Sequence, residues 1–348
     1  MSDERPREQP RPRAKGLRVA RRVRPSGASG GDGGTRWAHR DRVAAIDCGT
    51  NSIRLLIADP GPDGTLVDVV REMRIVRLGE GVDRTGRLAA TAIERTRVAL
   101  ADYADAIDRN GATSVRMVAT SATRDAANRD DFATMVRGVL GVGAEVITGA
   151  EEAALSFAGA VAGLGAPEFP VLVADIGGGS TELVLGSSAD GELRSHSMDV
   201  GCVRMTERHL RDDPPTPAQI AATETDVRAA IAAAARDVPL REAATFVGVA
   251  GTVTTLAAIV HGLVEYDADV IDGLTITAAQ VDDVTRRLLA MAHAQRATLP
   301  VMHPGRVDVI GGGALILREL VEAVGVASVV ASEHDILDGI ALRLLAAP

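Results

Sequence analysis

Two copies of one α/β unit, with a cleft between them, are the fold that this sequence predicts. From residue 43 onward, short apolar runs typical of strands alternate with segments of helical periodicity, which indicates α/β layers. The 348 residues are enough for about two domains. The pattern of residues 45–57 also returns 128 positions later, at residues 173–185. A duplicated unit explains all three observations.

The repeated segment reads AIDCGTNSIRLLI in the first copy and VADIGGGSTELVL in the second. Each copy reads as a strand that ends in aspartate, a turn of small residues and glycine, and a second strand. One match of this kind is a weak signal. One copy in each half of the chain indicates two related domains that face each other.

The remaining elements follow from apolar spacing and turn residues. In chain order they are strands at 43–47 and 53–59, a helix at 89–109, a strand at 115–122, a strand at 145–148, a helix at 151–161, strands at 171–175 and 181–186, a helix at 217–235, a strand at 245–250, a helix after Gly251, a helix at 277–294 and a helix after Gly313. The last segment, SEHDILDGIALRLLA, predicts an amphipathic helix that opens with a capping box of Ser332 and Asp335.

Charge is distributed unevenly along the chain. Residues 1–40 carry 11 basic and 4 acidic side chains, a net charge of +7, whereas the whole chain is −9 and the remainder therefore −16. We interpret residues 1–42 as a disordered basic tail, because they are rich in Arg, Pro, Gly and Ser and lack a hydrophobic period. The tail is either an electrostatic arm for polyanions or a non-functional extension.

Lysine is nearly absent, since Lys15 is the only lysine in the chain. This excludes a Walker-type phosphate loop, a protein-kinase site and Schiff-base chemistry, each of which needs a lysine in the folded part. Any phosphate chemistry must use backbone amides, arginine and metal.

The two cysteines, Cys48 and Cys202, are too few for a disulfide framework, and the seven histidines show no metal-binding spacing. No stretch approaches 18 apolar residues, and the basic tail is not followed by an apolar signal segment, so we expect no membrane span and no secretion. These features lead us to expect a cytoplasmic protein.

The two repeated turns carry the strongest chemical signal. Each exposes backbone N–H groups that can bind an anion, because glycine permits close approach. The aspartates in front, Asp47 and Asp175, have the wrong charge for phosphate unless a divalent cation lies between them. They are therefore candidate Mg²⁺ partners, directly or through water. The alternative for either turn alone is an ordinary glycine hairpin.

Two further glycine segments predict anion sites. GVAGTVTTLAAI at 248–259 places Gly251 and Thr252 between a strand and a helix whose first N–H groups are free. RVDVIGGGALIL at 306–317 reads as strand, glycines and helix, with Arg306 at its start.

These segments together resemble a known family. The order DCGTNSIRLLI, VATSATRDAAN, VITGAEEA, VADIGGGSTELVLG, DVGCVRMTE, GVAGTVTTLAA, HPGRVDVIGGGA and SEHDILDGIA looks like the exopolyphosphatase/guanosine pentaphosphate phosphohydrolase family, in particular its short, two-domain actinobacterial members. The resemblance covers residues 43–346. It implies duplicated actin-like, ribonuclease H-like domains of the actin, Hsp70 and sugar-kinase superfamily. We expect domain I at 43–165, completed by a C-terminal helix at 333–346, and domain II at 166–332.

The resemblance also implies roles for individual residues. Glu152, in VITGAEEA, matches the catalytic base that activates a water molecule, with Glu151 as the adjacent alternative. Asp175, and Asp47 in the other repeat, would hold Mg²⁺. Arg124 is either a phosphate ligand or a partner of Asp125 or Asp130. The residues expected to bind substrate phosphates are Gly49, Thr50, Asn51, Ser52, Arg54, Arg124, Gly177, Gly178, Gly179, Ser180, Thr181, Gly251, Thr252, Arg306 and Gly312.

The expected activity is Mg²⁺-dependent removal of the terminal phosphate from inorganic polyphosphate. The alternatives are removal of the 5′ γ-phosphate of guanosine pentaphosphate, an actin-like sugar or acetate kinase, and a polyanion-binding protein without catalysis. Family members of this type commonly form homodimers, and nucleic acid is not the expected partner. For Glu182, the alternative to a functional role is a structural one, as the partner of a residue in the other repeat such as Arg54.

Overall fold

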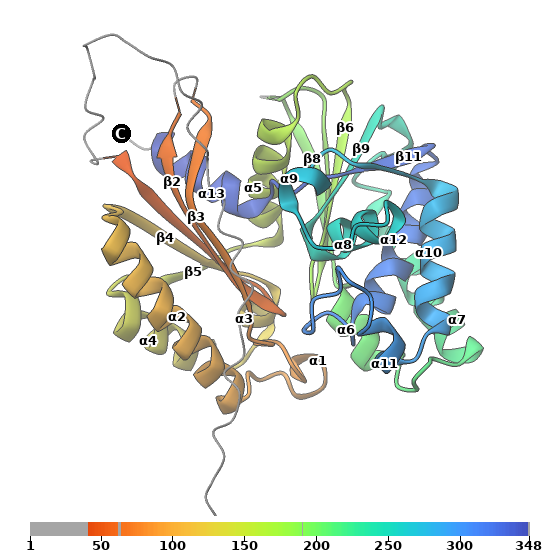
Figure 1. Ribbon diagram of the computed structural model, residues 1–348, viewed down its shortest axis with the longest axis horizontal. Coiled ribbons are helices and arrows are strands. Elements are labelled where there is room, and N and C mark those ends of the chain that lie inside the picture. The colour runs from red at the N-terminus through yellow and green to blue at the C-terminus, as the bar shows by residue number, and fades with distance from the viewer. Residues whose placement is uncertain (1–40, 62–63, 190, 347–348) are drawn as a thin grey trace, which may run out of the picture.

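Two β-sheets side by side, each covered by helices, form the two lobes of this computed structural model, which describes residues 41–61, 64–189 and 191–346 (Figure 1). The strands of the first sheet are β1 (Val43–Cys48), β2 (Ser52–Pro60), β3 (Leu66–Ile75), β4 (Ser114–Ala119) and β5 (Ala144–Val146). Those of the second are β6 (Val171–Ile176), β7 (Thr181–Gly186), β8 (Leu193–Met198), β9 (Thr245–Val249), β10 (Thr275–Thr277) and β11 (Ser328–Ala331).

The helices connect and cover these strands. Those of the first half are α1 (Val82–Thr85), α2 (Ala90–Asn110), α3 (Ser121–Asp125), α4 (Arg129–Leu140) and α5 (Gly149–Gly163). Those of the second half are α6 (Cys202–Arg208), α7 (Pro217–Ala234), the 3₁₀ turn η2 (Leu240–Glu242), α8 (Ala250–Val260), α9 (Ala268–Ile271), α10 (Ala278–Ala290), α11 (His293–Arg296), α12 (Ile310–Val324) and α13 (Ile336–Ala346).

The two sheets share one topology, which confirms the predicted duplication. The first sheet has the order β3-β2-β1-β4-β5, and the second contains the order β8-β7-β6-β9-β11 with β10 added at its edge. In each, the first three strands are antiparallel and the next are parallel to the first strand. Even the register repeats, because Asp47 lies opposite Arg54 as Asp175 lies opposite Glu182.

Alternate side chains of the central strands fill cores on both faces of each sheet. On the first sheet, Ile46 packs with α2 and α4 through Leu100 and Phe132, while the opposite face packs on α13. On the second sheet, one face packs on α7, α8, α10 and α12, and the other packs on α5. Both central strands, β1 and β6, are buried along their whole length, as expected for strands covered on both faces.

Helices α5 and α13 cross between the lobes. α5 lies inside the predicted domain I (43–165), yet Phe157 and its neighbours pack on the second sheet. α13 returns from the end of the chain to the first sheet, where Ile340 contacts the β1 core. The two helices approach so closely that a Cβ at Gly159 would lie 1.8 Å from the Asp335 carbonyl oxygen. Glycine is therefore required at this crossing.

Two local predictions are wrong. Residues 306–309 form turns, not a strand, and α12 begins at Ile310, so the fourth glycine segment does not repeat the strand-turn pattern. The last helix begins at Ile336 and is not capped by Ser332. Ser332 instead makes a tight turn with His334, and the Asp335 carboxylate accepts the Leu337 N–H at 3.0 Å. Asp335 therefore takes the capping position, because the Ser332 hydroxyl is used in the turn with His334.

Within the described residues, no helix has both the length and the apolar character needed to cross a bilayer. The predicted basic tail, apart from its last two residues, lies outside the described part of the chain.

Candidate active site

A cavity between the lobes gathers most of the residues that the sequence singled out. Its volume is about 90 Å³, and both sheets contribute to its wall. The predicted residues that line it are Asp47, Gly49, Thr50, Asn51, Ser52, Arg54, Glu152, Asp175, Gly177, Gly178, Ser180, Gly251, Thr252 and Arg306. Arg124, Gly179, Thr181 and Gly312 do not line it.

The two repeated turns meet at this cavity. The β6–β7 turn approaches the β1–β2 turn so closely that a Cβ at Gly178 would lie 2.8 Å from Thr50 Cβ. The Thr50 hydroxyl also lies 2.9 Å from the Ser121 hydroxyl of α3. Glycine at 178 thus allows the two halves of the duplicated fold to come into contact.

Backbone hydrogen bonds orient the first turn. The Thr50 carbonyl accepts the Gly79 N–H at 2.9 Å, and the Asn51 carbonyl accepts the Val76 N–H at 3.0 Å. In a trans peptide the N–H of the next residue points away from the carbonyl. The N–H groups of Asn51 and Ser52 therefore point away from the 76–79 segment, and both residues line the cavity.

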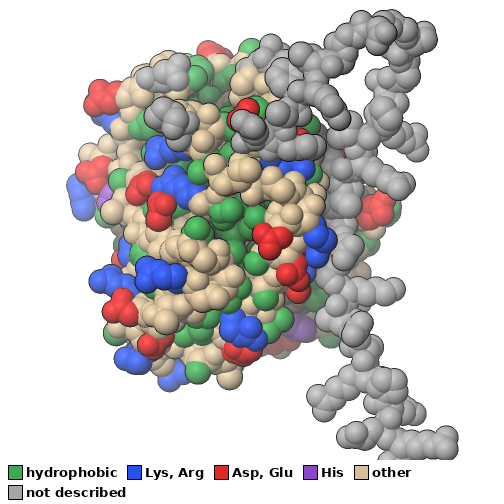
Figure 2. All heavy atoms as spheres, turned by 90° about the vertical axis from the view of Figure 1, so that its left-hand side faces the viewer, with side chains coloured by type: hydrophobic (Ala, Val, Ile, Leu, Met, Phe, Trp, Pro, Cys, Tyr) green, Lys and Arg blue, Asp and Glu red, His purple; other side chains and the backbone are tan. Residues whose placement is uncertain are grey.

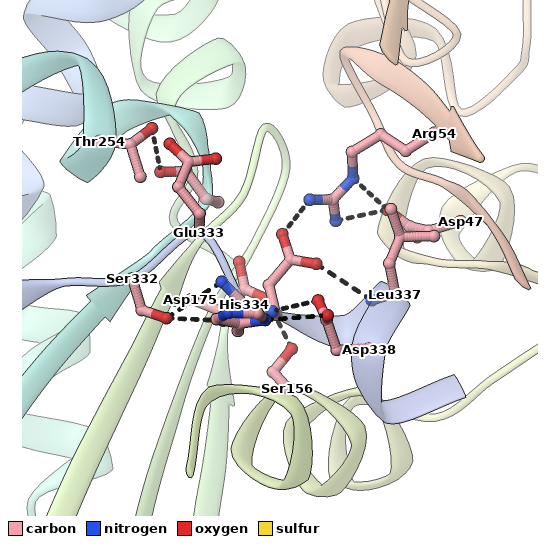
Figure 3. Close-up of polar contacts among 12 residues, drawn as sticks. Asp47, Arg54, Ser156, Asp175, Thr254, Ser332, Glu333, His334, Leu337 and Asp338 are labelled. Carbon is pink, nitrogen blue, oxygen red and sulfur yellow. Dashed lines mark hydrogen bonds and ion pairs between the residues drawn. The ribbon is translucent and has the colours of Figure 1, made fainter. Parts of the chain in front are cut away.

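Three buried aspartates surround one arginine at the base of the site (Figure 3). Arg54 donates to Asp47 Oδ2 from Nε at 3.1 Å and from Nη2 at 2.7 Å, and its Nη1 donates to Asp335. Asp175 lies beside this group and accepts the Ser156 hydroxyl at 2.6 Å. Arg54 was predicted to bind substrate phosphate, but three of its donors are already committed to carboxylates.

Burial is the largest influence on the pKa values of Asp47 and Asp175. It raises the pKa of Asp47 in spite of the Arg54 contact. The pKa of Asp175 is raised to about 6, first by burial and then by the charge of Asp335, while the Ser156 hydrogen bond opposes the shift. Three carboxylates with one guanidinium leave an excess of negative charge, which favours a cation at this position.

The donor set fits a magnesium ion. Asp47 Oδ1 is buried without a hydrogen-bond partner, and an unsatisfied carboxylate oxygen is a suitable ligand for a hard cation. Among the described residues, no group of three or more acidic, histidine or cysteine side chains forms a complete metal cage. Mg²⁺ commonly uses one or two carboxylates and completes its shell with water and substrate phosphates. Asp47 and Asp175 are candidates of this kind.

The structure separates the two candidate bases. Glu152 is 7% exposed and lines the cavity. Glu151 points outside, where its side chain pairs with Arg116 at 3.0 Å. Arg124 donates to Glu152 Oε2 at 3.1 Å and to the Ile147 carbonyl at 3.0 Å, so it orients Glu152 and does not pair with Asp125 or Asp130. This geometry supports Glu152 over Glu151.

Glu182 is a buried carboxylate near the site that the sequence analysis considered only as a structural partner. It is 1% exposed and accepts the Ser197 hydroxyl at 2.8 Å, so it is not a partner of Arg54. Burial raises its pKa to about 8, with a further contribution from Asp175. Burial and the neighbouring Glu182 charge also raise the pKa of Glu152 well above its ordinary value. The position of Glu182 opposite Asp175 in the repeat is the sequence signal that could have placed it near the site.

The turn segment before α12 adds an arginine, which contacts α8, to the cavity wall. Arg306 donates to the Thr255 hydroxyl at 3.0 Å, and its guanidinium lies over Gly251, where a Cβ would come within 2.0 Å of Nη2. Gly251 is thus required for Arg306 to reach the cavity.

The four predicted residues outside the wall have other surroundings. The Thr181 hydroxyl donates to the Val200 carbonyl at 2.6 Å, and the Gly179 carbonyl accepts from Arg204. Gly312 lies in the first turn of α12, where a Cβ would come within 2.9 Å of the Cys202 carbonyl oxygen. Arg124 is linked to the cavity wall through its hydrogen bond to Glu152.

Comparison with known proteins agrees with the motif order. A model of the Ppx/GppA phosphatase family matches residues 57–347. Exopolyphosphatase 2 of Mycobacterium tuberculosis is 55% identical over 315 residues, which cover 87% of this chain and 98% of that protein. The guanosine-5′-triphosphate,3′-diphosphate pyrophosphatase of Aeromonas salmonicida is 30% identical over 302 residues, or 87% of this chain and 59% of that protein.

The crystal structure of an exopolyphosphatase-like protein has the same fold. It superposes with a TM-score of 0.84 at 44% identity and covers 87% of this chain and 97% of that one. The similarity therefore extends over both lobes and the cavity between them.

Proposed function

Because this chain belongs to the Ppx/GppA phosphatase family, we propose that it is an exopolyphosphatase that releases terminal phosphate from inorganic polyphosphate. One observation carries the reaction class: a single cavity combines two anion-binding turns, Arg306 and the buried carboxylate of Glu152. The substrate follows from similarity, since the 55% identical relative bears the name exopolyphosphatase.

Glu152 is the proposed general base. Water attacks the terminal phosphorus, a new O–P bond forms, and the bridging O–P bond breaks. The proton of the water passes to the Glu152 carboxylate, and the bridging oxygen leaves with the shortened polyphosphate. A raised pKa makes Glu152 a stronger base at the pH where it is ionised. Arg124 holds one of its oxygens and so fixes its orientation.

The turns supply the charge stabilisation. The N–H groups of Asn51, Ser52, Gly178 and Ser180 and the guanidinium of Arg306 are positive groups at the cavity wall, whereas the Gly49 and Gly177 N–H groups are bonded within their own turns. Preorganised donors of this kind stabilise the charge that develops on the phosphoryl oxygens. Hydrolysis then needs no covalent intermediate. Cys202 lines the cavity, but burial raises the pKa of its thiol to about 11, so it is a poor nucleophile.

Magnesium is the proposed cofactor, held by Asp47 and Asp175. When bound, it would neutralise phosphate charge beside these carboxylates. Arg54 donates to Oδ2 of Asp47 and is itself held by Asp335. These contacts fix the Asp47 carboxylate and leave its Oδ1, which has no hydrogen-bond partner, for the ion.

The test compares adjacent glutamates. Purified chain with Mg²⁺ is assayed for orthophosphate release from long-chain polyphosphate, tripolyphosphate, guanosine pentaphosphate and nucleoside triphosphates. Glu152→Gln is expected to lower kcat about 10²- to 10⁴-fold, the usual contribution of a general base, while polyphosphate still binds. Glu151→Gln is the matched control and should change kcat less than about twofold, because Glu151 lies outside the cavity.

The other results identify the alternatives. Release from guanosine pentaphosphate alone would indicate the nucleotide phosphohydrolase. ATP-dependent phosphorylation of a sugar or acetate would indicate a kinase. Polyphosphate binding without turnover, equal in wild type and Glu152→Gln, would indicate a non-catalytic binder.

A further inference from the structure

Three carbonyl groups of the β6–β7 turn, those of Gly177, Gly178 and Gly179, are held from one side by α6. The Cys202 N–H donates to the Gly177 carbonyl at 3.0 Å, and the Val203 N–H donates to the Gly178 carbonyl at 2.9 Å. Each trans peptide unit carries its carbonyl and the next N–H on opposite sides. Fixing these carbonyls toward α6 therefore points the next two N–H groups away from α6.

The third carbonyl of the turn is held by a side chain. Arg204 Nε donates to the Gly179 carbonyl oxygen at 2.6 Å. That carbonyl shares its peptide unit with the N–H of Ser180, a residue of the cavity wall. The Arg204 side chain therefore sets the direction of the Ser180 N–H.

The same guanidinium also bridges the lobes. Arg204 Nη1 donates to Asp83 at 2.8 Å, and Nη2 donates to Asp125 at 2.5 Å. Asp83 belongs to α1 and Asp125 to α3, both in the first lobe. Arg204 is only 13% exposed, so its charge is shielded from salt more than that of a surface pair. The Arg204 side chain thus connects the contact between the two lobes with the conformation of the β6–β7 turn.

We propose that Arg204 is a positioning residue, which aims the Ser180 N–H at the substrate's terminal phosphate when the lobes are together. The proposal rests on the proposed function, because it assigns a phosphate to the cavity. This role accounts for the three polar contacts of Arg204, which does not line the cavity. Two of the contacts bind aspartates of the first lobe, and the third orients the β6–β7 turn.

Arg208 provides a matched control on the same helix. It pairs with Asp83 at 2.9 Å and with Asp226 at 3.4 Å, but it has no hydrogen bond to the turn. Arg204→Met and Arg208→Met remove the same charge from α6. Only the first releases the Gly179 carbonyl. Asp125→Asn weakens the lobe contact and leaves the Arg204–Gly179 hydrogen bond possible.

Steady-state kinetics on long-chain polyphosphate is the first measurement. Arg204→Met is expected to lower kcat about 10- to 100-fold, because misplaced transition-state donors cost catalysis more than binding. Its KM should change less than about threefold. Arg208→Met should stay within about threefold of wild type in both constants, and Asp125→Asn should lie between the two in kcat. Equal effects of the two arginine variants, or an unchanged kcat in Arg204→Met, would overturn the proposal.

Hydrogen–deuterium exchange gives a readout that does not depend on turnover. Peptides covering residues 177–181 should exchange faster in Arg204→Met than in wild type or Arg208→Met, at equal thermal stability. Wild-type protein that hydrolyses none of the substrates would refute the proposed function, while the exchange comparison would still decide the role of Arg204. Unchanged exchange in Arg204→Met would refute that role even in an active enzyme.

Discussion

One pair of equivalent positions, Arg54 and Glu182, gives the two copies of the repeated hairpin opposite charges beside their aspartates. In the first repeat, Asp47 faces Arg54 across the strands, and the guanidinium compensates its charge. In the second, the equivalent partner of Asp175 is Glu182, a second buried carboxylate. In the first hairpin, Arg54 holds the Asp47 carboxylate in a fixed position, which suits a cation site. In the second hairpin, the Glu182 carboxylate contributes to the raised pKa of the neighbouring Glu152.

Removing Glu182 should shift the pH dependence of catalysis. Burial and then the Glu182 charge raise the pKa of Glu152, so the proposed base loses its proton only at higher pH. In Glu182→Gln, Glu152 should ionise more easily, and the acid limb of the pH–kcat profile should move to lower pH. Glu151→Gln should leave the limb in place. A limb that moves to higher pH, or not at all, would contradict the coupling between the two glutamates.

Local sequence patterns predicted the residues of the site that lie near their own turn. Gly49, Asn51, Gly177 and Ser180 line the cavity because strand, turn and strand are encoded within a few positions. The roles of Arg54 and Thr181 were predicted less well. Their partners, Asp335 and the Val200 carbonyl, are brought in by tertiary packing, and no local pattern reports a contact with a residue 281 positions away.

At the scale of elements, the crossing of α5 and α13 connects the lobes to the site. Asp335 immediately precedes α13 and caps it, bonds to Arg54 and lies against Gly159 of α5. A Cβ at Gly339 would lie 2.0 Å from the Leu155 carbonyl oxygen, so both helices need glycine at their contact. The helix axes could not come this close with larger residues.

Gly159→Ala should therefore destabilise the protein. The new methyl group would overlap the Asp335 carbonyl, and overpacking of this kind costs roughly 1–3 kcal/mol. We expect a melting temperature several degrees lower, measured by calorimetry. Gly138→Ala is the control, because this exposed position in α4 has no heavy atom within 4 Å of the added Cβ. It should stabilise the helix by about 0.5–1 kcal/mol. Equal melting temperatures for the two variants would contradict the close crossing.

Sequence periodicity predicted most of the elements that flank the site but not all that complete it. Strands β3 and β8 were missed because their side chains are mostly half-buried and lack a clear apolar run. Both strands lead into the segments that hold the turns, 76–79 and 201–204. The segment at 306–309 was taken for a strand because Val307 and Val309 alternate with polar residues, whereas the chain turns there to bring Arg306 over Gly251.

At the scale of the whole molecule, the charge balance opposes a polyanionic substrate. Residues 41–348 carry a net charge of −16 against +7 in residues 1–40. On the face shown in Figure 2, acidic and basic side chains lie interspersed, so no field of one sign dominates there. Capture of polyphosphate must then rely on the arginine and amide donors of the cavity, on accompanying cations, or on the basic residues that precede β1.

Deleting residues 1–40 should decide between these sources, because each responds differently to salt. The shortened chain keeps the −16 charge, so repulsion should lower its kcat/KM for long polyphosphate at low ionic strength. Screening reduces that repulsion, and the Debye length is about 8 Å at 0.15 M. We therefore expect kcat/KM of the shortened chain to rise with salt at constant free Mg²⁺ and to approach the full-length value. A full-length chain with glutamine at the arginines of residues 1–40 should behave like the deletion, whereas identical salt curves for all three proteins would exclude these basic residues as a source of capture.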